Sequence, residues 1–302
     1  MKIDVHAHIH PESCLEAIPP RPGGKNLPDA ISDLPARIKH MDERQIDIQL
    51  LSVPPFLTGL GAEAARQLNQ GIAEAVEAYP SRFMGLATVP LEEPDAAVVE
   101  LEHAIHELGF KGVEIVSNVG GEDLHERKFA PFYRKVQELD VPVFIHPHNV
   151  VGRENRLSPF FLTNLIGNPT DTAIAAAGLI FGGVLKEFPG LKFILAHGGG
   201  TCPYLIGRWD RGWSLELEGP RIIDEPPSEY FRLLYFDALV HNQTALEFLV
   251  TKAGADHVLL GSDYPFGMGD PDQVGHISAM SIGAKEKELI FGGNAQRLFK
   301  LC

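Results

Sequence analysis

The sequence predicts an α/β fold, a single (β/α)8 barrel that spans residues 1–302. Short apolar, β-branched segments alternate with helical segments along the whole chain, and no change of composition divides it into two domains. Ionisable residues stand at the ends of several expected strands, which is where barrel enzymes carry their active sites. A doubly wound open sheet is the alternative architecture, but no G-x-G-x-x-G motif follows the first expected strand.

The order of the elements follows from hydrophobic periodicity and from the positions of proline and glycine. Strands are expected within residues 1–10 and at 46–53, 83–89, 112–117, 141–146, 192–197, 233–239 and 258–263. Helices are expected at 37–44, 61–79, 95–108, 129–139, 171–188, 203–217 and 244–253, and further helices close the chain. A region rich in proline and glycine, Pro11–Pro35, is expected to form a long loop inserted after the first strand, and 147–169 a second long loop.

Composition restricts the classes of function. The chain has 26 lysine and arginine residues against 40 aspartate and glutamate residues, and its net charge of −14 argues against partners such as nucleic acid or an anionic membrane surface. The longest apolar run is too short to cross a bilayer. The three cysteines lie far apart in the sequence and fit a reducing compartment, so we expect a soluble cytoplasmic protein.

The N-terminal segment carries the clearest chemical signal. Apolar and polar residues alternate from Met1 to His10 as in a β-strand, and His6 and His8 are two positions apart. Side chains two apart on a strand point to the same face, so both imidazoles can face one point. Neutral imidazole is a good ligand for a divalent metal ion, and a rigid strand lowers the cost of ordering two of them.

Further candidate ligands stand at or near the ends of other expected strands. They are His146, His197, Asp237 and Asp263. Any one of them alone is more often a hydrogen-bonded residue at the end of a strand, but in a barrel all of them meet at one mouth. Three histidines and a carboxylate leave a catalytic zinc ion one position for water, whose pKa the ion lowers. A further histidine that is not a ligand is then a natural general base.

These motifs resemble the decarboxylating branch of the amidohydrolase superfamily. The similarity runs over nearly the whole chain and is carried by His-x-His at 6–8, His146, His-Gly-Gly-Gly at 197–200, Gly-Ser-Asp-Tyr-Pro-Phe at 261–266 and the segments around 37–42, 207–213, 226–230 and 293–295. The resemblance implies a barrel of the metal-dependent hydrolase type with one divalent ion, expected to be Zn²⁺, bound by His6, His8, His146 and Asp263. It also implies that His197, together with the ligand Asp263, carries the catalysis, with His197 as the acid/base.

The resemblance further implies a homodimer, because Arg208 matches an arginine that reaches into the neighbouring subunit's site to hold a substrate carboxylate. Lys25 falls near the place of another substrate-binding arginine, and Phe160 near that of a tryptophan. Lysine presents a point charge where arginine presents a bidentate fork, so we expect a related carboxylic acid of different shape. The fourth expected strand has no lysine at its end, which favours one metal ion over two.

We therefore expect a non-oxidative decarboxylase of a small unsaturated or aromatic carboxylic acid, with Arg208, Lys25 and Phe160 as substrate contacts. Asp237 is expected either to contact the substrate or to support a metal ligand. A hydrolase such as a lactonase, or a hydratase, is the alternative on the same scaffold, because a fold does not choose the reaction. A third hypothesis, a non-enzymatic metal-binding protein, fits less well, because structural zinc sites are usually closed by four ligands rich in cysteine.

Overall fold

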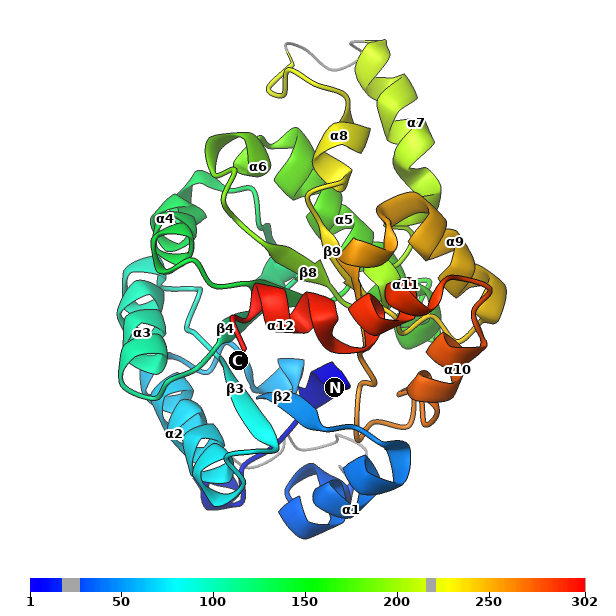
Figure 1. Cartoon of the computed structure of the whole chain (residues 1–302). Helices are drawn as coiled ribbons and strands as arrows, with labels where there is room; N and C mark the ends of the chain where they lie inside the picture. The colour runs from blue at the N-terminus through cyan, green and yellow to red at the C-terminus, as the bar shows by residue number, and fades with distance from the viewer. Residues whose placement is uncertain (18–27, 216–220, 302) are drawn as a thin grey trace.

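A closed ring of parallel strands forms the centre of the protein. The computed structural model describes residues 1–17, 28–215 and 221–301, and within these ranges eight strands follow one another in the order β1-β2-β3-β4-β7-β8-β9-β10 with helices around them (Figure 1). The strands are β1 (Ile3–His8), β2 (Ile48–Ser52), β3 (Phe83–Ala87), β4 (Gly112–Val116), β7 (Val143–His146), β8 (Phe193–Leu195), β9 (Tyr235–Asp237) and β10 (Val258–Leu259).

Main-chain hydrogen bonds between the segment that follows β10 and the first strand close the sheet. The Val5 N–H donates to the carbonyl of Leu260 at 2.9 Å, and the Asp263 N–H donates to the carbonyl of His6 at 2.8 Å. All pairings within the eight-stranded sheet are parallel, as the alternation of strands and helices requires. The predicted (β/α)8 barrel is thereby confirmed.

The helices cover the outside of the barrel, and one of them covers its lower end. They are α1 (Leu34–Arg44), α2 (Ala62–Ala78), α3 (Pro94–His106), α4 (Ala130–Leu139), α5 (Asn168–Phe181), α6 (Val184–Glu187), α7 (Cys202–Ser214), α8 (Pro227–Phe231), α9 (Gln243–Ala253), α10 (Gln273–Ala279), α11 (Ala284–Glu288) and α12 (Asn294–Leu298). Helix α12, red in Figure 1, crosses the front of the barrel at the end where the chain begins. Within the described ranges, no helix combines the length and the apolar character needed to cross a membrane.

Alternation along the strands separates the interior of the barrel from the layer between strands and helices. In β7, Phe144 points inward, whereas its neighbours Val143 and Ile145 belong to the outer core under the helices. The interior cluster is Ile3, Val5, Leu50, Leu86, Phe144, Ile194, Ala196 and Leu259, and α12 and the residue after it close it from below with Ala295, Leu298 and Phe299. The lower half of the barrel is therefore filled with apolar side chains, which leaves the upper end for polar groups.

A bulge in β1 determines which side chains reach that upper end. Asp4 pairs with Gln49 of β2, but Ala7 pairs with Leu51, so β1 has one extra residue between these pairs. Strict alternation would place His6 on the face of Asp4 and opposite to Val5. Instead Val5 belongs to the interior cluster and His6 also faces the interior, where its ring lies 4.9 Å from that of Phe144.

Several predicted boundaries differ from the structure. The expected helix at 171–188 is interrupted between α5 and α6, because Gly183 adopts a left-handed conformation (φ 78°) that an α-helix does not contain. Strand β8 ends at Leu195, two residues before His197, and β10 ends at Leu259, four residues before Asp263. A short hairpin of β5 (Asn118–Val119) and β6 (Glu122–Asp123) was not expected. In the long loop after β1, short helical turns form at Glu12–Cys14 and Asp29–Ile31.

The closure of the barrel by α12 leads to a test of stability. Leu298 is only 2% exposed, and we expect Leu298→Ala to lower the free energy of unfolding by about 2–5 kcal/mol through lost burial and a cavity. Val99→Ala on the outer face of α3, where the side chain is 61% exposed, is the control and should change it by less than about 0.5 kcal/mol. Equal urea midpoints for the two variants would contradict a packed role for α12.

Candidate active site

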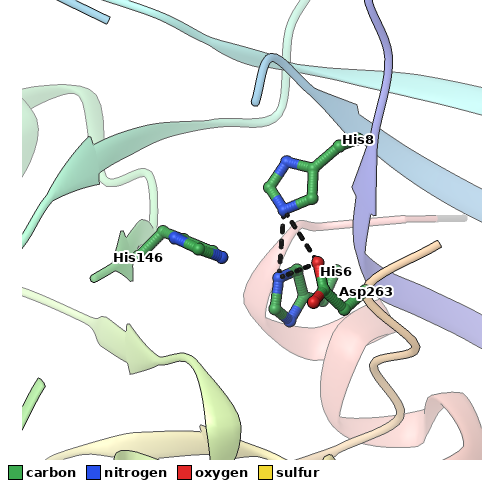
Figure 2. Close-up of side chains that lie close together, drawn as sticks. All are labelled: His6, His8, His146 and Asp263. Atoms are coloured by element: carbon green, nitrogen blue, oxygen red, sulfur yellow. Dashed lines mark hydrogen bonds and ion pairs between the residues drawn. The ribbon is translucent and has the colours of Figure 1, made fainter. Parts of the chain in front are cut away.

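Four side chains converge inside the upper end of the barrel (Figure 2). His6 and His8 come from β1, His146 is the last residue of β7, and Asp263 lies after β10; their ligand atoms are all within 4.8 Å of one another, and all four residues are buried. The Nε2 atoms of His6 and His8 are 3.2 Å apart, and Asp263 Oδ1 lies 3.4 Å from the first and 3.3 Å from the second. The structure thus brings together the four predicted ligands.

In each of the three imidazoles, Nε2 faces the cluster and Nδ1 contacts an oxygen atom on the opposite side of the ring. The acceptors are Asp237 Oδ2 for His6 (2.7 Å), the Val53 carbonyl for His8 (3.2 Å) and the Pro147 carbonyl for His146 (2.9 Å). A carbonyl oxygen or a carboxylate can only accept, so Nδ1 must carry the proton in each ring. The three Nε2 atoms therefore present lone pairs to the centre of the cluster, the form that binds a metal ion.

The carboxylates favour a positive charge at the centre of the cluster, which either a second proton on His6 or a metal ion can supply. Burial raises the pKa of Asp263, but His6, His197 and His8 outweigh this effect and hold that pKa well below its usual range. Burial lowers the pKa of His6, but the carboxylates of Asp263 and Asp237 outweigh it and raise the pKa of His6 to about 9. Burial, together with the neighbouring imidazoles, holds the pKa of His146 well below its ordinary value.

The donor set fits a divalent metal ion in both chemistry and spacing. Asp263 Oδ1 is buried and has no hydrogen-bond partner among the described residues. Ligand atoms bound at about 2.0–2.2 Å to one ion lie about 3.0–3.5 Å from each other in tetrahedral or octahedral arrangements, which matches the separations around His6 and His8. Within the described ranges this is the one such group of histidine, cysteine and acidic residues found.

His197 stands beside the cluster and does not join it. The centre of its ring is 5.3 Å from that of His6 and 5.2 Å from that of His146, about as close as the ligand rings are to each other, but His197 is not in the group whose ligand atoms meet. Its Nε2 lies 3.8 Å from Asp263 Oδ2, which is too long for a direct hydrogen bond. The side chain is partly exposed and lines a cavity that lies next to the cluster, so His197 separates the ligand cluster from the space where a small molecule can bind.

The cavity has a volume of about 480 Å³, which suits a small organic ligand. It opens between the upper ends of β8 and β9 and helices α5, α7 and α9, and its lining residues are Asn164, Leu165, Asn168, Pro169, His197, Gly198, Gly200, Pro203, Tyr204, Leu239, Val240, His241, Ala245, Phe248, Leu249 and Met268. Most of this lining is apolar. The side chains of Asn164, Asn168 and His241 add polar groups to it.

These polar cavity residues were not predicted from the sequence. Asn164 lies in a π-helical turn, Thr163–Gly167, that runs directly into α5, and Asn168 is the first residue of α5. His241 lies in the short loop after β9. Neither a spacing pattern nor a motif distinguishes them from other loop residues. Only the three-dimensional arrangement of the loops after β7, β8 and β9 places them beside His197.

The residues predicted to contact the substrate have different locations. Arg208 is exposed on α7, and Phe160 lies in the loop before α5 with 85% of its surface exposed. Neither lines the cavity of this chain. Lys25 lies outside the described residues. Asp237, at the end of β9, is fully buried and bonded to His6, so of its two expected roles the contacts favour support of a metal ligand.

Comparisons with known proteins agree with this geometry. A family model described as Amidohydrolase matches residues 3–301. A 2-amino-3-carboxymuconate-6-semialdehyde decarboxylase from Dictyostelium discoideum is 37% identical, and the match covers 87% of this chain and 75% of the relative. A gamma-resorcylate decarboxylase from Rhizobium sp. is 31% identical over 88% of this chain and 86% of its own.

A solved structure extends the likeness to the fold. The crystal structure of a dihydroxybenzoic acid decarboxylase from Polaromonas sp., with bound manganese and the inhibitor 2-nitroresorcinol, superposes with a TM-score of 0.87. That similarity covers 99% of this chain and 97% of the other, at 27% identity. All three are decarboxylases by name, and the solved structure shares the fold in which the ligand cluster lies.

The ligand cluster leads to a test that needs no substrate. Asp263→Ala removes the one anionic ligand, so we expect the purified variant to lose most of its metal, measured by elemental analysis after dialysis. His197→Ala should keep the metal content of the unchanged protein, because its ring does not belong to the cluster. Equal metal loss in both variants would show that His197 is also a ligand. Full metal content in Asp263→Ala would refute the assignment of Asp263 as a ligand.

Proposed function

Because this chain belongs to the amidohydrolase family, we propose that it is a metal-dependent carboxy-lyase that removes CO₂ from a small unsaturated or aromatic carboxylic acid. The observation that carries the proposal is the position of His197, between a buried ligand cluster and a cavity of small-molecule size. The names of the relatives support the class of reaction. Hydrolysis or hydration on the same scaffold is the alternative, which the products distinguish.

We propose zinc as the native ion, because three imidazoles and one carboxylate suit it well. Manganese is the alternative ion to test, since a related decarboxylase carries it. When bound, a divalent ion supplies a positive charge and Lewis acidity that can bind and polarise a substrate oxygen. His6, His8, His146 and Asp263 hold it, and the oxygen acceptors behind the three imidazoles keep their Nε2 lone pairs directed at it.

Decarboxylation replaces a C–C bond with a C–H bond, so one proton must reach the carbon that bears the carboxylate. We propose that His197 delivers it, because its imidazole borders both the ligand cluster and the cavity. Protonation of that carbon interrupts the conjugation of the substrate. The electron pair of the breaking C–C bond then restores the conjugation as CO₂ leaves, so the carboxylate and one proton give CO₂ and a C–H bond.

The lining of the cavity supports a substrate that is largely flat and apolar. The walls from α9 and from the loop after β9 are mainly aliphatic and aromatic, while Asn164, Asn168 and His241 can form hydrogen bonds with hydroxyl, keto or amino substituents. We keep Lys25 as a proposed partner for substrate charge. Phe160 is proposed to contact the substrate when a second subunit covers its exposed loop.

We propose that the active enzyme is a homodimer in which Arg208 completes the partner's site. Two exposed side chains, Tyr204 at 82% and Leu165 at 51%, line the cavity, and Phe160, 85% exposed, lies in the loop before α5. Apolar groups gathered in this way mark an interaction surface. Helix α7, which carries Arg208, lies at the edge of the barrel in Figure 1, where it can present a guanidinium to a neighbouring subunit.

Product analysis tests the reaction. The protein loaded with Zn²⁺ or Mn²⁺ is incubated with a panel of hydroxybenzoic and muconate-type acids, and we expect CO₂ release and a product that has lost the carboxyl group from at least one acid. His197→Ala with full metal content should reduce kcat for that acid about 10²–10⁴-fold as lost acid/base catalysis. Products that gain the mass of water without CO₂ would replace the proposal with hydrolysis or hydration.

Subunit mixing tests the shared site. Arg208→Ala and His197→Ala should each be nearly inactive, since each lacks one group at every site. A heterodimer of the two rebuilds one site with both groups, so random mixing of C2 dimers should recover about a quarter of the original activity. Arg208→Ala mixed with a protein that lacks both side chains is the control and should recover none. Heterodimers without any recovery would place Arg208 outside the partner's site.

A further inference from the structure

The carboxylate of Asp237 contacts two functional parts of the site at once. Its Oδ2 accepts a hydrogen bond from His6 Nδ1 at 2.7 Å. Its Oδ1 accepts from the backbone N–H of Gly198 at 2.8 Å and from that of Leu239 at 3.2 Å. Asp237 is completely buried, so these three contacts are shielded from bulk solvent.

All three groups that meet Asp237 are donors. The backbone N–H groups can only donate, and His6 Nδ1 must carry its proton because His6 Nε2 faces the ligand cluster. A carboxylate is the one side chain of this size that accepts at both ends. An asparagine in its place has one acceptor and one NH₂ group, so it can satisfy His6 or the N–H of Gly198, but not both.

The contact with Gly198 concerns the neighbouring His197. The backbone of His197 has a positive φ (55°), and so do the three residues after it, Gly198 (φ 61°), Gly199 (φ 74°) and Gly200 (φ 59°). Non-glycine residues rarely adopt this conformation, and it persists where surrounding contacts enforce it. The His197 ring gives little help, because its buried Nδ1 finds no hydrogen-bond partner among the described residues. The orientation of His197 therefore depends on the bonds of this turn.

A glycine in the intervening strand leaves room for the contact between Asp237 and His6. Strand β10 and its extension lie between β9, which carries Asp237, and β1, which carries His6. Gly261 is at this crossing, where a Cβ would lie 2.8 Å from Asp237 Cβ and 3.0 Å from His6 Cβ. Because glycine has no side chain, Asp237 can reach across the intervening strand to His6.

We infer that Asp237 is a positioning residue. Its one carboxylate orients both the ligand His6 and the acid/base His197, so that the proton donor keeps a fixed position relative to the metal ion. The role of Asp237 in orienting His6 follows from the geometry of the ligand cluster and does not depend on the reaction. The statement about the proton donor rests on the proposed function. The tests are therefore chosen so that two of the three readouts need no substrate.

The experiment compares Asp237→Ala, Asp237→Asn and Gly261→Ala with a matched control, Glu100→Gln. Glu100 on α3 is also a buried carboxylate, and it accepts from Arg66 Nε and Asn69 Nδ2, far from any ligand in sequence and on an outer helix. The readouts are the affinity of the metal-free protein for Mn²⁺ by electron paramagnetic resonance, hydrogen exchange of the Gly198 amide by NMR, and kcat and KM at saturating metal.

Asp237→Ala should weaken Mn²⁺ binding about 10–100-fold, speed the exchange of the Gly198 amide and lower kcat more than it raises KM. Asp237→Asn should retain either the Mn²⁺ affinity or the protection of Gly198, but not both. Gly261→Ala leaves every functional side chain in place and should impair both the Mn²⁺ affinity and the protection of the Gly198 amide. It serves as the test if Asp237→Ala does not fold. Glu100→Gln should lower the melting temperature alone.

Two results would overturn the inference. Asp237→Asn with unchanged Mn²⁺ affinity and unchanged Gly198 protection would show that the double contact is not needed. Suppose that Asp237→Ala binds Mn²⁺ weakly but keeps a protected Gly198 amide and an unchanged kcat at saturating metal. That result would show that Asp237 does not position His197. Since Mn²⁺ affinity and amide exchange are measured without substrate, the absence of decarboxylation would refute the proposed function and leave these two readouts to decide on Asp237.

Discussion

The site depends on the way in which the last strand closes the barrel against the first. β1 carries two ligands, and the segment after β10 carries Asp263, which is more than 250 positions away along the chain. The N–H of Asp263 donates to the carbonyl of His6 at 2.8 Å, and the N–H of His8 donates to the carbonyl of Tyr264 at 2.7 Å. These bonds hold the carboxylate beside both imidazoles, so the ligand cluster and the closed barrel form together.

A buried polar network stabilises this closure behind the ligands. Arg37 of α1 is fully buried; it donates to the His8 carbonyl at 2.5 Å and to Gln49 Oε1 at 3.2 Å. Gln49 in turn donates to Asp4 Oδ2 at 2.8 Å, and Asp4 accepts from the N–H and the hydroxyl of Ser262. Burial lowers the pKa of Arg37 to about 10, which still leaves it charged at neutral pH. The network therefore ties α1, both closing strands and the bulge of β1 with bonds to charged groups, which are stronger than neutral ones.

Much of the site could be predicted because its ligands follow recognisable local patterns. His146 ends an apolar strand, as expected, and His6 and His8 are two positions apart on β1. The bulge between Asp4 and Ala7 could not be predicted, because it arises from pairing with β2 and with the closing segment and not from local preference. The conformation of His197 is a similar case. A strand was expected to reach it, but β8 ends at Leu195 and long-range contacts enforce the turn.

The three glycines after His197 are easily recognised in the sequence, but the packing that requires them is not. In the sequence alone, three successive glycines indicate a close approach of the backbone to a metal ion or to the substrate. In the structure, a Cβ on Gly198 would lie 2.4 Å from Val240 Cγ1, and one on Gly200 would lie 1.9 Å from the carbonyl oxygen of Pro169. The close neighbours are thus the loop after β9 and the start of α5, which belong to the walls of the cavity. Pattern reasoning finds the need for glycine, but only the packing shows which surfaces require it.

The ligands and the cavity walls occupy different parts of the fold, and this separation has a consequence for specificity. His6, His8 and His146 lie within paired strands, where a one-residue shift would reverse the direction of the side chain. The cavity is lined instead by the loops after β7, β8 and β9 and by the helices that follow them. Loops tolerate substitution and insertion far better than paired strands. Changes in the shape of the substrate can therefore be accommodated in the walls while the ligand cluster and the carboxylate that orients His6 stay unchanged, which fits relatives of similar sequence that are named for different acids.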